Sequence, residues 1–386
     1  MSNVLIIGVF ESFFLALLLF TKKKNTVSDS ILALFFLVFG ISIGFSLFES
    51  YNRNNGFPYP ALILTTAPFL LLHGPLLWLY IKSLTNQYFK VKPIYLLHGI
   101  PFLLMLIQHS VQIFFLPANE KIEMAQTESF RHFYSYYFFV FAISFSPLVY
   151  YYFGLKLINR YKLKIEGYFS DTSGIDLKWL RLIIGSWLVV HCIINAFFIA
   201  DLFIPIASFG MMQFLSFLMA TVYIIFIGFY GLKQENVFHN RTINLDLEKA
   251  AALQPMDQYK TSLPAPEKEF IRRLLDFMRD EKPWLEPDIT IKSLSERLNV
   301  STEYFSEVIN SDLNKNFFDF INHYRVEEFK AVCKKESNTN LTITGLAFNC
   351  GFNSKASFYR AFSKNTGMSP SEYINEVSQK SETPFS

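Results

Sequence analysis

The chain has 386 residues, of which 51% are apolar, 18% aromatic and only 17% charged, and its formal net charge is +3. This composition excludes an ordinary soluble globular protein, in which about a quarter of the residues are charged. The three cysteines, Cys192, Cys333 and Cys350, fall in predicted helical segments and cannot all pair. A secreted protein built on a disulfide framework is therefore also excluded.

Charged residues are distributed unevenly along the chain. From Met1 to Tyr230 there are 15 basic and 10 acidic residues, gathered in short clusters. From Gly231 onward there are 20 basic and 22 acidic residues, and they occur every few positions. The sequence therefore predicts a membrane domain over residues 1–230, a linker over 231–266 and a water-soluble domain over 267–386.

Seven apolar runs in the first 230 residues are long enough to cross a bilayer, which takes about 20 residues of helix. The first is followed by Lys22–Lys24 rather than preceded by basic residues, which is the reverse of a secretory signal peptide. We therefore expect a bundle of seven transmembrane helices. The runs are Asn3–Phe20, Ser30–Phe48, Pro60–Ile81, Ile94–Phe115, Phe133–Phe153, Leu180–Asp201 and Phe209–Tyr230.

The basic residues between these runs predict the orientation of the bundle, because short cytoplasmic loops collect Lys and Arg. Every second connection is rich in basic residues, starting with Lys22–Lys24 and ending with the connection that contains Lys156 and Arg160. The intervening connections contain few. This alternation places the N-terminus outside the membrane and the C-terminal domain in the cytoplasm.

Ionisable side chains within membrane spans are rare and are functional candidates by default. Here Glu11, His73, His98 and His191 are the candidates for a sensing pocket, and the alternative is that the histidines only hold helices together through hydrogen bonds. The external connections are short, so a small-molecule or lipid-borne ligand would have to enter the bundle itself. His98 and His109 lie 11 residues apart, about 16 Å along a helix, and cannot share an ion. No catalytic residues, metal or cofactor are expected.

The region after the last apolar run changes character twice. Residues 231–266 lack apolar periodicity and contain Pro255, Pro264 and Pro266, which is typical of a linker. From Glu267 onward the apolar residues recur with helical spacing, and no alternation typical of strands follows. The predicted fold class is therefore all-α for both domains.

Two helix-turn-helix patterns occur about 50 residues apart in the soluble domain. The first consists of Ile291–Leu298 and a second helix capped by Ser301. The other consists of Ile343–Cys350 and a helix that begins near Ser354 and ends near Lys364. Two such patterns in one domain are stronger evidence for a nucleic-acid-binding protein than a single one.

The turns and the joining helix support this arrangement. Asn299 and Gly351 stand where each first helix ends, and both residue types tolerate the left-handed backbone conformation that such a turn requires. In Phe317–Lys335 the apolar residues are mostly three and four apart. We expect this segment to be a helix that joins the two units.

The sequence from about Tyr259 to about Tyr373 resembles the DNA-binding domain of the AraC family of bacterial transcription regulators, most clearly in the second helix-turn-helix pattern. The resemblance is carried by LAFNCGFNS at Leu346–Ser354, SFYRAF at Ser357–Phe362 and TGMSPSEY at Thr366–Tyr373, and it begins near Tyr259. It implies a tandem helix-turn-helix domain. Its two recognition helices would enter successive major grooves of double-stranded DNA, about 34 Å apart.

The same resemblance implies roles for particular residues. Arg360 matches a base-contacting arginine on the second recognition helix, and its guanidinium is suited to guanine. Neighbouring residues of this unit are expected to contact phosphates or bases: Asn353, Ser354, Lys355, Ser357 and Lys364. The corresponding candidates of the first unit are Ser301, Thr302, Tyr304 and Ser306.

The charges of the soluble domain weaken the expected affinity for DNA. Where the family usually has basic residues, the first recognition helix has Glu303, Glu307 and Asp312, which repel phosphate. Residues 267–386 contain 16 basic and 18 acidic residues, a net charge of −2. Because affinity for DNA depends strongly on neutralised phosphates, we expect modest binding per monomer. A homodimer on the membrane would supply the missing affinity through avidity.

Together these patterns predict a membrane-bound, sequence-specific DNA-binding transcription regulator rather than an enzyme. It would lie in the bacterial inner membrane and couple a signal sensed at the membrane to gene expression. An alternative from another class is a seven-span membrane enzyme or transporter with a regulatory helix-turn-helix domain. A third hypothesis is that proteolysis releases the soluble domain.

Overall fold

The computed structural model describes most of the chain, and all regular elements within it are helices, as predicted. The predicted linker lies outside the described residues except for its first three positions, which belong to a helix. The ranges described are 2–23, 25–86, 89–172, 175–204, 206–233, 268–334 and 342–381.

The chain forms two compact units. The first comprises Met1–Asn159 and Leu177–Arg241, and the second comprises Arg160–Asp176 and Thr242–Ser386. Residues 160–176 stand between two apolar runs, so the sequence analysis placed them in the membrane domain. In the structure, the described residues of this segment belong to the second unit.

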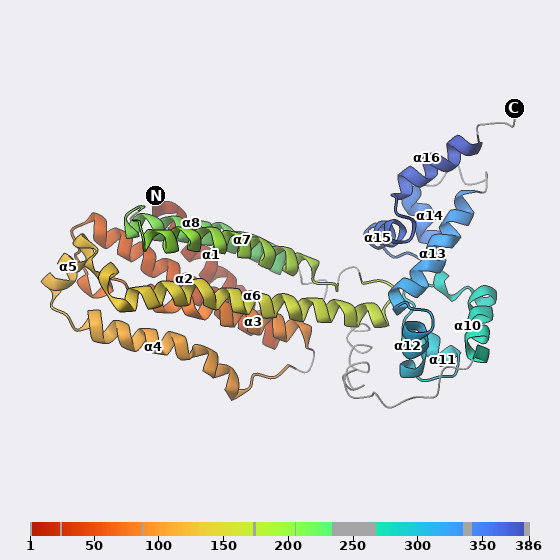
Figure 1. Cartoon of the computed structure of the whole chain (residues 1–386), viewed down its shortest axis with the longest axis horizontal. Coiled ribbons are helices and arrows are strands. Elements are labelled where there is room, and N and C mark those ends of the chain that lie inside the picture. Colours follow the sequence, from red (N-terminus) through yellow and green to blue (C-terminus); the bar gives the residue numbers. More distant parts are fainter. Residues whose placement is uncertain are drawn as a thin grey trace. The chain divides into compact units, whose positions relative to one another are not determined.

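The first unit contains the apolar helices. Seven of its segments are long and apolar enough to cross a membrane, in agreement with the seven predicted runs. Figure 1 shows them side by side, with the short helix α5 (Ala118–Thr127) at one end, between α4 and α6. The main helices are α1 (Ser2–Phe20), α2 (Val27–Asn54), α3 (Leu70–Thr85), α4 (Ile100–His109), α6 (Tyr134–Tyr168), α7 (Lys178–Asp201) and α8 (Phe209–Lys233).

Two of the predicted spans are not continuous α-helices. Two 3₁₀ turns, η1 (Pro60–Leu62) and η2 (Ala67–Phe69), precede α3. A longer 3₁₀ segment, η3 (Pro93–Gly99), precedes α4, and a π-helical turn, η4 (Ser110–Phe114), follows it. Each of η1, η2 and η3 has a proline at its first or second position, where the missing N–H donor is tolerated.

Helix α6 is longer than its apolar run predicted. The sequence analysis ended this span at Phe153, but the helix continues to Tyr168 and is 35 residues long. Lys156 and Lys164, which were assigned to a cytoplasmic loop, therefore lie on its last turns. An apolar run marks only the part of a helix that suits lipid, whereas the helix itself continues as long as backbone hydrogen bonds and packing support it.

Small residues allow α1 to approach its neighbours closely. A Cβ atom added at Gly8 would lie 2.5 Å from Thr221 Oγ1 of α8, and one added at Gly40 of α2 would lie 3.1 Å from Ser12 Cβ. Such contacts are typical of helices packed within a membrane. The outer faces of α1 and α4 instead expose large apolar side chains such as Phe10 and Leu103, which suits contact with lipid.

The second unit contains both predicted helix-turn-helix patterns. α11 and α12 form the first, α14 and α15 the second, and α13 joins them. The bounds agree with the predicted helices to within about two residues. They are α10 (Lys268–Glu281), η7 (Pro283–Leu285), α11 (Ile291–Arg297), α12 (Thr302–Ser311), α13 (Phe317–Cys333), α14 (Ile343–Asn349), α15 (Lys355–Thr366) and α16 (Pro370–Ser381).

Helix α13 contributes to two apolar cores. Phe320 and Ile321 pack into the core of the first helix-turn-helix, and Val326 and Phe329 pack into the core of the second. This one buried helix therefore joins the two helix-turn-helix motifs into a single domain. Because each unit is too small to bury much apolar surface alone, a shared helix is what stabilises the pair.

Turns and caps form as the sequence predicted. Asn299 has φ of 54° and Gly351 has φ of 90°, so both adopt the left-handed conformation. Ser301 Oγ accepts a hydrogen bond from Tyr304 N at 3.1 Å and begins α12. Ser354 Oγ accepts one from Ser357 N, also at 3.1 Å, and begins α15.

Candidate nucleic-acid interface and bundle pocket

Helix α15, the second predicted recognition helix, has one buried and one accessible face. Phe358 and Phe362 fill the core of the second helix-turn-helix, whereas Lys355 and Lys364 are exposed. Ser357 lies on the buried face with only 1% of its surface exposed. Its expected contact with DNA is therefore corrected, because the hydroxyl points into the domain and no phosphate can reach it.

Most of the other DNA-binding candidates of the second helix-turn-helix are exposed. Lys364 Nζ lies 2.7 Å from both carboxylate oxygens of Asp319, and Lys355 Nζ lies 5.4 Å from the centre of the Tyr359 ring. Asn353 Nδ2 donates to Asp288 Oδ1 at 2.7 Å. These groups can exchange their exposed partners for phosphate or base atoms at little cost, because exposed ion pairs contribute only about 0–1 kcal/mol.

Arg360 is less free than the other candidates, because residues upstream of α7 hold it. Its guanidinium donates to Thr172 Oγ1 at 2.9 Å and lies 3.5 Å from Asp176 Oδ2. The group also lies 4.8 Å from the centre of the Phe318 ring, and the side chain is 24% exposed. We call residues 169–176, between α6 and α7, the connector; positions 173 and 174 lie outside the described residues.

The connector is anchored in the second unit through Ser170. Its hydroxyl donates to Ile289 O at 2.9 Å, and its carbonyl accepts from Asn322 Nδ2 at 2.8 Å. Phe169 forms an isolated antiparallel bridge with Thr290. These hydrogen bonds are buried, so they are more specific than the surface ion pairs and hold the connector in one position on the second unit.

Arg325 organises the surroundings of the connector. Its buried guanidinium donates to Trp284 O and Glu286 O, both at 2.8 Å, and lies 3.3 Å from Ser170 Oγ. Burial lowers the pKa of Arg325 to about 10, and the carboxylate of Asp171 opposes this shift. The arginine therefore stays charged at neutral pH. Sequence reasoning missed Arg325, although a charged residue on a helix predicted to be buried was the available signal.

The DNA-binding candidates of the first helix-turn-helix contact other residues of the AraC-type domain. Ser301 caps α12, and Thr302 Oγ1 lies 3.2 Å from Ser295 Oγ. Tyr304 packs edge-to-face on Phe270 with ring centres 5.1 Å apart. Ser306 Oγ accepts a hydrogen bond from Asn310. These residues, which the resemblance suggested as DNA contacts, therefore also cap or stabilise helices of their own domain.

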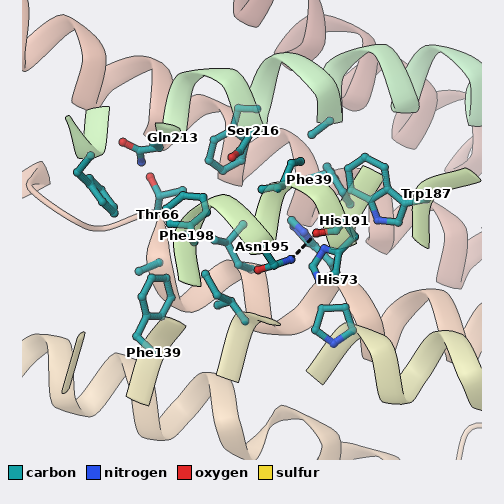
Figure 2. A pocket seen from close by; sticks show the side chains of 18 of the residues that line it. Phe39, Thr66, His73, Phe139, Trp187, His191, Asn195, Phe198, Gln213 and Ser216 are labelled. Atoms are coloured by element: carbon teal, nitrogen blue, oxygen red, sulfur yellow. Dashed lines mark hydrogen bonds between the residues drawn. The ribbon is translucent and has the colours of Figure 1, made fainter. Parts of the chain in front are cut away.

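The membrane unit contains a separate feature, a cavity of about 120 Å³. Its walls come from α2, α3, α6, α7 and α8 together with the segment that precedes α3. Most lining side chains are aromatic or aliphatic, including Phe39, Phe139, Trp187 and Phe198 (Figure 2). The lining residues that carry polar side-chain atoms are Glu49, Thr66, His73, Tyr151, Trp187, His191, Asn195, Gln213 and Ser216.

The structure brings together two of the four residues proposed for sensing. His73 of α3 and His191 of α7 both line the cavity, and Figure 2 shows them at the same end of it. His98 lies elsewhere, with Nδ1 2.8 Å from Tyr150 Oη, and Glu11 of α1 is not among the lining residues. Within the described ranges, no three His, Cys, Asp or Glu residues are placed to hold a metal ion.

Glu49 is a buried carboxylate that sequence reasoning missed, because it directly follows the second apolar run. Its Oε1 accepts from Thr66 N at 3.0 Å and from Thr66 Oγ1 at 2.8 Å. Its Oε2 accepts from Gln213 Nε2 at 2.6 Å. Three neutral donors thus surround the carboxylate, which therefore already has its hydrogen-bond partners before any ligand enters.

At the other end of the cavity, the polar side chains bind neighbours within the bundle. His73 Nε2 lies 3.1 Å from Ser42 Oγ, and Asn195 binds both His191 O and Ser144 Oγ. The imidazole of His191 lies against the backbone of Ile143 and Ser144 of α6, and its Nε2 atom is sealed from the cavity.

Comparison with known proteins identifies the C-terminal unit. Residues 294–376 match the helix-turn-helix domain family. They form an AraC-type helix-turn-helix domain. An uncharacterized HTH-type transcriptional regulator of Escherichia coli K12, YijO, is 33% identical over 97 residues, which are 25% of this chain and 33% of that protein.

A second relative and one solved structure cover a similar share of the chain. The melibiose operon regulatory protein of E. coli K12 is 23% identical over 125 residues, which are 32% of this chain and 39% of that protein. A protein of unknown function from Listeria innocua is 25% identical, with a TM-score of 0.24, and the match covers 28% of this chain and 95% of that one. The chain thus spans 33% to 39% of the curated relatives' lengths.

The two predicted recognition helices of the AraC-type domain differ in charge. On α15, Lys355, Arg360 and Lys364 present three cations, whereas α12 presents Glu303 and Glu307. The basic residues therefore lie on the second helix-turn-helix, and the acidic ones lie on the first. Thr172 and Asp176, which hold Arg360, lie about 180 residues before it, and no local pattern in the sequence connects them.

Proposed function

We propose that this chain is a membrane-bound, DNA-binding transcription regulator. The observation that carries the proposal is an AraC-type helix-turn-helix domain in the same chain as seven apolar helices. The names of the two E. coli relatives, one a transcriptional regulator and one an operon regulatory protein, support it. The distribution of basic residues supports an inner-membrane location, with the N-terminus outside and the AraC-type domain in the cytoplasm.

In this proposal α15 enters the major groove of double-stranded DNA. Arg360 forms paired hydrogen bonds to guanine O6 and N7, while Lys355 and Lys364 contact phosphates. Helix α12 contributes less, because its acidic residues repel the DNA backbone. A homodimer in the membrane places two AraC-type domains on neighbouring sites and raises the affinity through avidity.

The connector supports a route by which the bundle controls DNA binding. A guanidinium that is hydrogen-bonded to Thr172 and paired with Asp176 cannot also bind guanine. The connector joins α6 to α7, and both helices line the cavity of the bundle. We infer that a signal in the bundle moves these helices and releases Arg360 for DNA.

The test is selection of bound sequences from a random double-stranded DNA pool by full-length protein in lipid nanodiscs. We expect a motif to be enriched, and Arg360→Ala to lose preference at one position of it at a cost of about 1–3 kcal/mol. Arg279→Ala, which removes an exposed arginine from α10 outside both helix-turn-helix units, should leave the motif unchanged.

The same selection with a Thr172→Val, Asp176→Asn variant covers the case in which the resting protein holds Arg360 away from DNA. No enrichment with either protein at low salt would reject DNA-binding regulation. It would favour the alternative of a membrane enzyme or transporter with a regulatory C-terminal domain. An identical motif for Arg360→Ala and the unaltered protein would reject the role of Arg360.

A further inference from the structure

The span that contains α4 is the least buried of the seven apolar spans. Only 6% of the apolar stretch in Pro93–Phe114 is buried, whereas the other six spans are 22% to 61% buried. Figure 1 shows α4 at the edge of the first unit. One side of the helix packs inward, where Phe102 and Met105 join an apolar core and His109 is buried. Most of its remaining surface is exposed in a single copy of the chain.

Two glutamines lie together on this exposed surface. Gln108 Nε2 donates to Gln112 Oε1 at 3.1 Å, so the two side chains share one side of the helix. Leu104, which is 59% exposed, precedes Gln108 by four residues and continues the same row. Gln112 belongs to the π-helical turn η4, and such turns are frequent at functional sites.

The hydrogen bond between the two glutamines uses only part of their capacity. A glutamine amide has two N–H donors and an oxygen that can accept two hydrogen bonds. Among the described residues, these two side chains bind only each other. The oxygen of Gln108 and both N–H groups of Gln112 are therefore left over.

Gln108 lies within the apolar span rather than at its end. It stands six residues before Phe114, where the span ends, which is about 9 Å along the helix axis. Polar groups without partners are costly in hydrocarbon, and glutamine side chains in membrane helices form hydrogen bonds across helices. Gln112 stands only two residues from that end, closer to water, so its free donors cost less.

We propose that the exposed side of α4 is the surface on which two copies of this chain dimerise, with Gln108 of one copy bound to Gln108 of the other. Copies in one membrane share an orientation, so a two-fold axis brings identical residues together. An amide both donates and accepts, and it is therefore its own complement. A lipid tail offers neither group.

This inference deepens the proposed function and rests on it for the membrane location. It names the interface of the homodimer that supplies avidity for DNA. Dimerisation through α4 does not involve the AraC-type domain. A failure to bind DNA would therefore leave the interface intact, and a failure to dimerise would leave DNA recognition by one copy intact.

The experiment measures energy transfer between full-length chains that carry a cyan or a yellow fluorescent protein at the C-terminus. The two are mixed in phosphatidylcholine vesicles without DNA, and the protein-to-lipid ratio is varied to obtain the dimerisation constant. Gln108→Leu should weaken dimerisation about 3- to 30-fold, the effect expected for an interhelical hydrogen bond in a membrane. Gln108→Asn keeps an amide and should retain most of the dimerisation, and Gln112→Leu should have a smaller effect than Gln108→Leu.

Cross-linking locates the interface in a second way. In a Cys192→Ala, Cys333→Ala, Cys350→Ala background, Gln112→Cys should form a disulfide with the same residue of a second copy when the vesicles are oxidised. Met211→Cys is the matched control, because Met211 is 56% exposed and lies equally close to the end of its own helix, α8. It should cross-link much more slowly.

Three results would overturn the proposal. Energy transfer no greater than that of a non-interacting mixture would mean that lipid covers α4. Equal dimerisation of Gln108→Leu and the unaltered protein would exclude the glutamine contact. Cross-linking of Gln112→Cys no faster than that of Met211→Cys would place the interface on another helix. Circular dichroism checks that Gln108→Leu is folded, and if it is not, the cross-linking rates decide.

Discussion

Gly351 shows how one residue sets the geometry of the second helix-turn-helix. Its φ of +90° suits glycine, and an added Cβ atom would lie 2.2 Å from Trp284 O and 2.9 Å from Leu285 Cα. The close approach keeps η7 against the turn, where Arg325 binds the same carbonyl of Trp284. Gly367 also has a positive φ, of +78°, but nothing lies within 4 Å of the position of its Cβ atom.

These two glycines give a matched prediction about stability. Gly367→Ala should cost only backbone strain, about 1–3 kcal/mol, whereas Gly351→Ala should cost clearly more because the backbone of η7 must also move. Hydrogen exchange of the amides of α14 and α15 measures the local free energy of opening. If both variants lost the same free energy of opening, the close approach of Trp284 O would make no contribution to stability.

At the scale of elements, the connector and α15 form one functional contact. Ser170 anchors the connector to α13 and to the segment before α11, and Thr172 and Asp176 then reach Arg360. The anchor and the contact with Arg360 therefore serve different purposes. The first holds the connector on the domain, and the second controls the residue expected to contact DNA.

A double-mutant cycle tests this control. The Thr172→Val, Asp176→Asn variant should raise the affinity of full-length protein for its selected DNA by about 5-fold, the equivalent of one hydrogen bond and a half-buried ion pair. In an Arg360→Ala background the same two changes should have no effect, since the residue they restrain is gone. Affinity is measured by fluorescence anisotropy at fixed salt.

General electrostatics provides the competing explanation for such a gain. Removing an acidic residue anywhere near DNA strengthens phosphate contacts, so Asp312→Asn at the end of α12 serves as the charge control. A gain that persists in the Arg360→Ala background, or that equals the effect of Asp312→Asn, would contradict the control of Arg360 by the connector.

At the scale of the whole molecule, the proposal requires that an apolar bundle and a soluble domain work while they remain one chain. The net charge of −2 over residues 267–386 disfavours tight DNA binding by a single released domain, because affinity for DNA depends on neutralised phosphates. Two membrane-held domains gain affinity through their high local concentration instead. Regulation at the membrane therefore predicts full-length protein bound to DNA, whereas regulation by proteolysis predicts a shorter soluble fragment.

Fractionation of a chain tagged at its C-terminus distinguishes them. We expect the full-length protein in the membrane fraction when its target genes respond, with the bound DNA recovered in the same fraction after cross-linking. The Arg360→Ala protein should stay in the membrane and lose the DNA. A shorter tagged fragment in the soluble fraction under those conditions would support proteolytic release.

Much of the fold was predictable from local sequence. The length of an apolar run determines which segments suit a bilayer, and helical spacing with capping residues such as Ser301 and Ser354 determines where the helices of the second unit begin. A turn that needs a positive φ selects residues such as Gly351. These features depend on a residue and its near neighbours, so the sequence displays them directly.

The sites depended on the tertiary structure. Only folding brings Gln213 to Glu49, Asp176 to Arg360, or His191 into the wall of a cavity, because these partners lie far apart in the sequence. The sequence by itself determined an all-α chain with seven apolar helices and a tandem helix-turn-helix. The tertiary structure decided which polar groups are paired, buried or left without a partner, since pairing depends on distance in space.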